Sequence, residues 1–122
     1  MYKNEEEIER EISKVLMTIG IPVNLLGFNY FKMAIMKVVE NNKYLIKVIK
    51  FLYPEVGKMF NVTGAMVERS MRHALDAAYQ RNKFSLLNDL FNATIIDPYY
   101  KPSSSELIAL INEYIKIVKV YY

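Results

Sequence analysis

Cysteine and tryptophan are absent from this 122-residue chain, and histidine occurs once, at His73. Without cysteine there is no disulfide framework, cysteine nucleophile or thiolate metal site, and one histidine excludes a metal site built from several. The four glycines are isolated, so no glycine-rich loop is available to hold a phosphate. Apolar runs are only a few residues long, which excludes a membrane span and a secretory signal. We therefore expect no cofactor and a cytoplasmic location.

An enzyme is the least favoured class of function. His73 has no partner at a spacing typical of acid–base catalysis, and no pair of carboxylates stands in a convincing active-site arrangement. Apolar residues make up 52% of the chain and charged residues 24%. This composition predicts a single globular domain spanning residues 1–122.

Negative charge is concentrated at the start of the chain. Residues 1–12 hold five glutamates against Lys3 and Arg10, whereas residues 32–83 hold ten basic and four acidic residues. A basic middle favours a polyanion partner such as nucleic acid. The alternative is an ordinary solvated surface, because many soluble domains have a pI near the 9.0 of this chain.

Apolar residues recur at spacings of three and four nearly everywhere, which predicts an all-α fold, a compact bundle of about six or seven helices. We expect helices at about 5–19, 28–41, 43–51, 54–60, 64–81 and 85–91, and a last one from about 104. Asn4, Thr63 and Ser103 stand where helix N-caps are needed, and Glu106 would complete a capping box with Ser103. Gly20 suits the end of the first helix.

The expected helix at 43–51 carries a row of lysines. Lys43, Lys47 and Lys50 would share one helix face, which is either a solvated face or a rail along a phosphate backbone. The residues expected to face inward are Leu45, Val48, Ile49 and Leu52.

The stretch from Tyr53 to His73 meets the packing demands of a helix-turn-helix, which we place at about 54–81. Gly57 is the small residue expected where two steeply crossing helices touch, Asn61 suits the tight turn, and Thr63 caps the second helix. The apolar residues expected to face the shared core are Val56, Phe60, Val62 and Val67.

The helix at about 64–81 has two distinct faces at about 100° per residue. The inner face would hold Val67, Met71, Ala74, Leu75 and Ala78, and the outer face Ala65, Met66, Arg69, Arg72, His73, Asp76 and Gln80, with Glu68 at the border. A recognition helix places the first turns of its outer face in the major groove, where arginine bonds guanine and glutamate accepts from cytosine. The alternative is a solvated face with a Glu68–Arg72 ion pair.

Several stretches together are similar to one known family: Ile19–Pro22, Leu52–Glu55, Lys58–Asn61, Val67–Arg69, Arg72–Ala74, Lys101–Pro102, Ser105–Glu106 and Ile108–Ala109. Between about residues 8 and 116 the chain resembles the C-terminal DNA-binding domain of stage zero sporulation protein A, the response regulator that initiates sporulation. The resemblance implies an all-helical effector domain that binds tandem promoter boxes in double-stranded DNA, commonly as a homodimer. It also implies a contact with RNA polymerase sigma factor, and residues 81–95 match the region linked to activation.

The resemblance places Glu68, Arg69 and Arg72 where the family reads bases. Met66 stands where the family usually has an arginine. Because methionine cannot donate a hydrogen bond, we expect one guanine contact to be lost and binding to the family's usual box to be weaker. Contacts to the DNA backbone are expected from Thr63, Ala65, His73, Lys47, Lys58, Arg81, Lys83 and Lys101.

No phosphoacceptor aspartate with the acidic pair and lysine of a receiver domain can be placed in the sequence. We therefore expect an isolated effector domain or a free-standing relative, located in the cytoplasm and on the nucleoid when bound. The main alternative is an interaction module that dimerises with a full-length relative and modulates it without reading DNA itself.

Overall fold

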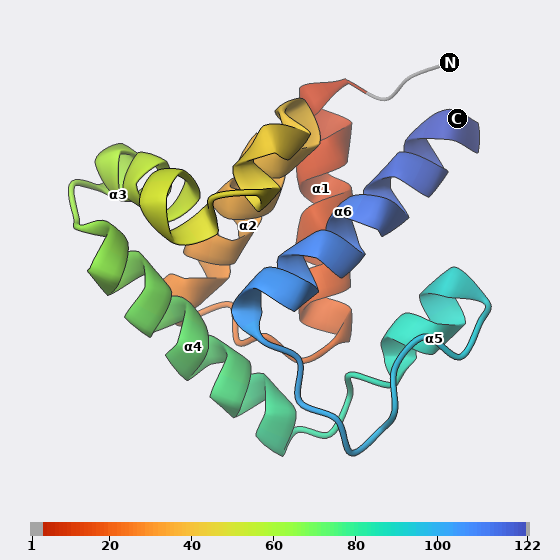
Figure 1. Cartoon of the computed structure of the whole chain (residues 1–122). Helices are drawn as coiled ribbons and strands as arrows, with labels where there is room; N and C mark the ends of the chain where they lie inside the picture. The colour runs from red at the N-terminus through yellow and green to blue at the C-terminus, as the bar shows by residue number, and fades with distance from the viewer. Residues whose placement is uncertain (1–3, 122) are drawn as a thin grey trace.

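The computed structural model describes residues 4–121, with side chains as far as residue 118. This part of the chain forms the α-helices α1 (Glu5–Thr18), α2 (Leu26–Glu40), α3 (Tyr53–Phe60), α4 (Gly64–Gln80), α5 (Leu86–Phe91) and α6 (Ser104–Tyr121) (Figure 1). Residues 4–121 contain no strand, so the all-α prediction is confirmed. None of the helices described is long and apolar enough to cross a membrane.

Helix α2 is the central element, and it packs against α1, α4 and α6. It begins at Leu26, two residues earlier than predicted, which brings Gly27 into its first turn. A Cβ on Gly27 would lie 2.3 Å from the carbonyl oxygen of Ser70 and 2.6 Å from the Cβ of Ala74. Only glycine therefore lets α2 approach α4 this closely.

The helix ends follow the predicted signals. The side chains of Asn4 and Thr63 each accept a backbone N–H three residues later, at 2.9 and 3.1 Å. Ser103 and Glu106 bond reciprocally, each side chain accepting the other's backbone N–H at 3.2 Å, which is the predicted capping box. After α1, Gly20 has a φ of +92°, in the left-handed region that glycine adopts most readily.

The segment of residues 42–52, here called the lysine segment, is not the single helix predicted at 43–51. It forms a 3₁₀ turn at Asn42–Leu45 and a π turn at Val48–Leu52. Between them Lys47 has a φ of −134° and a ψ of 67°, which interrupts the helical hydrogen bonds. Pro54 lacks an N–H, and its ring crowds the carbonyl four residues earlier, so an α-helix cannot continue unbroken into α3.

This backbone changes which side chains face inward. Leu52 is buried, and Leu45 and Val48 are half-buried, but Ile49 is 73% exposed and its predicted inward position is wrong. The prediction that Lys43, Lys47 and Lys50 share one helix face is also wrong, because Lys43 lies on the 3₁₀ turn, Lys50 lies on the π turn, and Lys47 is a non-helical residue between them.

Side-chain hydrogen bonds hold the middle of the loop between α5 and α6. The side chain of Asn88 accepts the N–H groups of Ile95 and Ile96, at 2.8 and 3.0 Å, and donates to the Ile96 carbonyl at 2.9 Å. Farther on, the Tyr79 hydroxyl of α4 donates to the Tyr99 carbonyl at 3.0 Å. These bonds hold the loop to α5 and to α4.

Candidate nucleic-acid interface

Helices α3 and α4 and the turn between them form the predicted helix-turn-helix. Asn61 takes the left-handed conformation (φ 57°, ψ 45°), and the N–H of Val62 donates to the Gly57 carbonyl at 2.9 Å. A Cβ on Gly57 would lie 2.5 Å from the Val62 carbonyl oxygen. Gly57 is therefore needed because the backbone of the turn packs directly on α3 at this point.

The core shared by the two helices is mostly as predicted. Val56 and Val67 are completely buried and Val62 is half-buried. The prediction for Phe60 is wrong, because its side chain is exposed at the edge of the core. Phe60 is the last residue of α3, and its ring packs on that of Tyr30, with 4.9 Å between the ring centroids.

The two faces of α4 are confirmed. Every residue predicted for the inner face is buried, every residue predicted for the outer face is exposed, and Glu68 is intermediate. The guanidinium of Arg72 donates to the Glu68 carboxylate at 3.2 Å, so the predicted ion pair is present in the unbound protein. Arg69 has no ion pair with any residue that the structure describes. On the outer face, Arg69 therefore has no ion pair among the residues described, and Arg72 is paired with Glu68.

A groove of about 880 Å³ runs between the middle of α4, the lysine segment and the start of α6. Glu68 and Arg72 line it from α4, Lys47 from the lysine segment and Lys101 from the loop before α6. The fold thus brings Lys47 and Lys101 beside two of the predicted base-reading residues. Lys101 is already engaged, since its ammonium pairs with the carboxylate of Asp76.

Tyr53 forms part of the floor of this groove. Burial, and secondarily the nearby carboxylate of Glu68, raise the pKa of Tyr53 to about 12. The phenol therefore stays protonated at neutral pH, and no second negative charge develops beside Glu68.

A smaller notch of about 430 Å³ lies on the opposite flank of α4, where the start of α2 meets it. Arg69 and His73 line it from α4, Asn24 from the loop before α2, and Leu26 as the first residue of α2. Sequence reasoning did not single out Asn24 or Leu26. No local signal could have identified them, because they reach the site only through the α2–α4 contact at Gly27.

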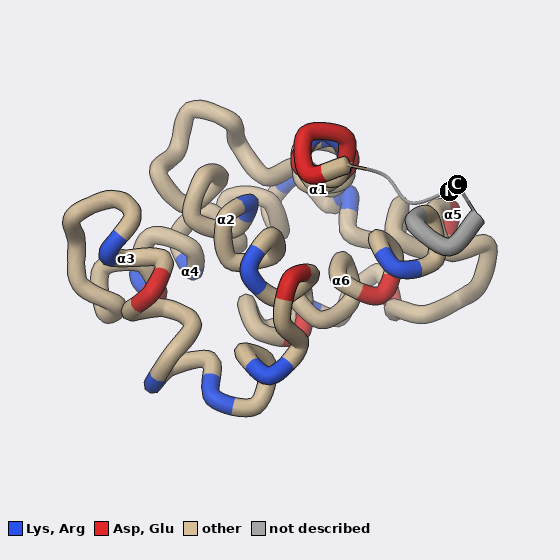
Figure 2. Tube along the Cα trace, turned by 90° about the horizontal axis from the view of Figure 1, so that it is seen from above, with Lys and Arg blue, Asp and Glu red and all other residues tan. Residues whose placement is uncertain are grey.

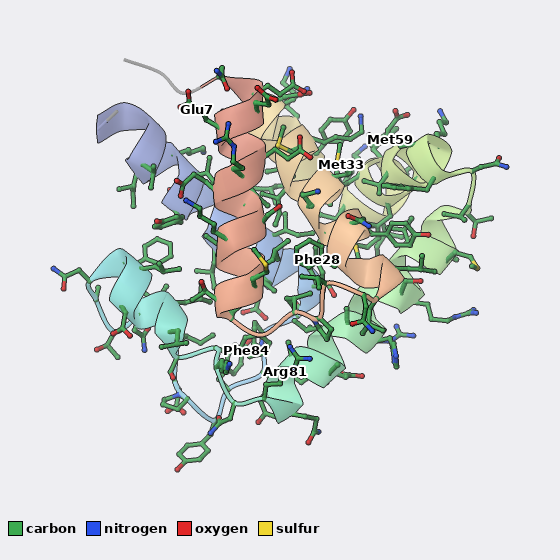
Figure 3. All side chains as sticks on the ribbon, turned by 180° about the vertical axis from the view of Figure 1, so that it is seen from behind. Glu7, Phe28, Met33, Met59, Arg81 and Phe84 are labelled. Carbon is green, nitrogen blue, oxygen red and sulfur yellow. The ribbon has the colours of Figure 1, made fainter. Side chains whose placement is uncertain are left out.

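Three of the predicted backbone-contacting residues lie away from this face. Lys58 is on α3 and pairs with Glu55 at 3.1 Å. Arg81 caps the far end of α4, roughly 18 Å along the helix axis from Arg69 at 1.5 Å per residue. Figure 3 shows Arg81 near Phe84, at the end of the molecule opposite Glu7, and Lys83 lies two residues after Arg81 in the chain.

The charge is divided as the sequence predicts. Figure 2 shows the acidic start of α1 seen end-on and, at another edge of the molecule, the segment between α2 and α3 with basic positions and no acidic ones. Among the residues described, no group of three or more His, Asp or Glu could hold a metal ion.

Residues 12–115 match the protein family described as sporulation initiation factor Spo0A C terminal. The chain belongs to this family. The Spo0A C-terminal family comprises DNA-binding effector domains of a sporulation response regulator and is not a family of enzymes. The match includes the whole helix-turn-helix, both flanks of α4 and the loop that carries Lys101, so the resemblance seen in the sequence is confirmed.

Proposed function

We propose that this chain is a single helix-turn-helix domain that binds double-stranded DNA sequence-specifically and regulates transcription. The observation that carries the proposal is the exposed face of α4, on which Arg69 and Arg72 are one helical turn apart and Glu68 stands beside them. Arginine side chains bond guanine with two hydrogen bonds in the major groove, and a glutamate accepts from cytosine. Membership of a DNA-binding family supports the same assignment.

The base contacts in this proposal come from the first turns of α4. Arg69, Arg72 and Glu68 read bases by hydrogen bonds, and Met66 makes only an apolar contact, for example with a thymine methyl group. Because Met66 replaces the hydrogen-bond donor that the family usually has there, the preferred sequence differs from the usual box.

The backbone contacts surround these bases. Thr63 caps α4, Ala65 and His73 lie on it close to the reading residues, and Lys47 and Lys101 line the groove beside them. Lys58, Arg81 and Lys83 contribute positive charge farther away. These phosphate contacts fix the position of the domain on the duplex but carry no sequence information.

We further propose the assembly that the resemblance to the family implies. Two copies bind tandem boxes as a homodimer, and the region of residues 81–95, which includes α5, contacts RNA polymerase sigma factor. The protein then acts in the cytoplasm, on the nucleoid when bound.

The experiment begins by selecting bound duplexes from random DNA, because Met66 alters the preferred sequence. Binding of the selected and a random duplex is then compared by fluorescence anisotropy. Arg69→Ala is expected to weaken binding to the selected duplex about 10- to 100-fold, and binding to the random duplex much less. Lys14→Ala removes the same charge from exposed α1 and serves as the matched control.

Two results would contradict the proposal. One is equal binding of the selected and random duplexes by the unaltered protein. The other is an equal loss for both duplexes in Arg69→Ala, which would mean that Arg69 contacts only phosphates.

A further inference from the structure

The lysine segment exposes apolar side chains that the proposed DNA face does not use. Ile46 is 77% exposed and Ile49 is 73% exposed, the highest values for any large aliphatic side chain that the structure describes, and Phe51 is 48% exposed. Ile46 and Ile49 also line the groove of about 880 Å³. Exposed apolar side chains that line one groove are typical of interaction sites in soluble proteins.

The exposure results from the irregular backbone. In a continuous helix Ile49 would face inward with Leu45 and Leu52. The break at Lys47 and the π turn that follows turn Ile49 outward instead. π turns within helical segments occur frequently at functional sites.

The charges around these isoleucines are uncompensated. Lys43, Lys47 and Lys50 have no acidic partner among the residues described. The two carboxylates that line the groove are bonded within the chain, Glu68 to Arg72 and Glu106 to the Tyr100 hydroxyl and to Ser103. The groove therefore combines an apolar surface with a positively charged rim.

We propose that this groove binds an acidic amphipathic helix of a partner protein. The apolar face of such a helix would cover Ile46 and Ile49, and its glutamates or aspartates would pair with Lys47 and Lys50, which line the groove. Duplex DNA fits less well, because its phosphates would satisfy the lysines but leave both isoleucines in water.

The position of the groove makes the partner a competitor of DNA. Glu68 and Arg72 form the wall opposite the lysine segment, so a helix seated between the walls blocks the residues proposed to read bases. This competition rests on the proposed function, whereas binding of the helix does not.

The probe is a synthetic peptide of about 18 residues, with leucines at positions i, i+3, i+4 and i+7 and mostly glutamates elsewhere. Its binding to the full chain is measured by fluorescence anisotropy, beside a scrambled peptide of the same composition. The designed peptide is expected to bind at least about tenfold more tightly than the scrambled one. Replacing Ile46 and Ile49 together by serine should weaken its binding about tenfold.

The matched control replaces Met17 and Val23 by serine, since both are exposed apolar residues outside the groove. This control should bind the peptide like the unaltered chain, and thermal unfolding followed by circular dichroism verifies that both double variants are folded. The selected duplex should displace the peptide. If the duplex fails to displace a peptide whose binding still depends on Ile46 and Ile49, that result contradicts the proposed DNA face on α4 but not the proposed peptide site in the groove.

Two outcomes would overturn the proposal. If the scrambled peptide binds as tightly as the designed one, the lysines act through charge alone and no helix is recognised. If the Ile46 and Ile49 double variant loses duplex binding but not peptide binding, the isoleucines belong to the DNA interface.

Discussion

Helix α4 and the lysine segment form opposite walls of one groove, yet different interactions hold them in place. α4 is 17 residues long, is capped at Thr63 and buries a complete face against α2 and α3. The lysine segment consists of two short turns in which only Leu52 is buried. Helix α4 is thus part of the hydrophobic core of the domain, whereas most side chains of the lysine segment lie on its surface. Substitutions on the buried face of α4 should therefore change stability, and substitutions of exposed residues in the lysine segment should leave stability nearly unchanged.

The largest effect is expected at Gly57. A Cβ there would meet the Val62 carbonyl oxygen at 2.5 Å, and backbone cannot move aside cheaply. Gly57→Ala should therefore destabilise the protein by about 2–3 kcal/mol, measured by urea unfolding. Ile49→Ala is the comparison variant, because it truncates an exposed side chain of the lysine segment. It should change the unfolding free energy by less than about 0.5 kcal/mol. Gly57 lies on α3, where the turn that leads into α4 packs. Equal losses in both variants would remove the distinction between the packed helix-turn-helix and the lysine segment.

The next largest effect concerns Tyr53, which joins the lysine segment to α3. Its pKa is about 12 in the folded protein, against an ordinary value near 10. The unfolded chain therefore releases this proton at lower pH, so stability is fully present below about pH 10 and falls as pH rises towards about 12. The expected loss is on the order of 2 kcal/mol.

This pH dependence is checked by urea unfolding at several pH values. Tyr53→Phe should flatten the decline between about pH 10 and 12. The matched control is Tyr100→Phe. The hydrogen bond from Tyr100 to Glu106 also raises its pKa, but Tyr100 is exposed, so this variant should retain most of the decline. An unchanged decline in Tyr53→Phe would show that the phenol is not desolvated as described.

The smallest effect is expected for the two residues that cap α4 and the 3₁₀ turn of the lysine segment. Thr63 caps α4, and Asn41 accepts the N–H of Lys43 at 3.0 Å at the start of the lysine segment. Thr63→Ala should cost about 1 kcal/mol, because α4 belongs to the cooperative core. Asn41→Ala should lower the free energy of unfolding by only a few tenths of that amount, because the 3₁₀ turn can open locally without unfolding the rest of the domain. A larger loss for Asn41→Ala would reverse the comparison.

The sequence predicts α4 well because its signals are local. The cap, the left-handed Asn61 and the apolar spacing all lie within about 20 residues, and none depends on a distant contact. The lysine segment has an equally helical spacing, but its position depends on contacts from afar. The buried amide of Asn112, on α6, lies 3.1 Å from that of Asn42, which is 70 positions away in the chain.

The candidate site divides in the same way. The faces of α4 follow from periodicity, so Arg69, Arg72 and the border position of Glu68 can be read from the sequence. The groove cannot be, because it needs three segments that the fold brings together. Ile46 and Ile49 are missed for this reason, and so is the role of Gly27, whose only signal is that it is small.

The ion pair between Glu68 and Arg72 affects how the proposed reader treats incorrect DNA sequences. A duplex that offers guanine to Arg72 and cytosine to Glu68 replaces the bond that the two side chains give up. A duplex that offers neither separates the pair and leaves both charges partly dehydrated without a partner. The Glu68–Arg72 bond of the unbound protein therefore disfavours binding to a wrong sequence, because that binding breaks the bond without replacing it.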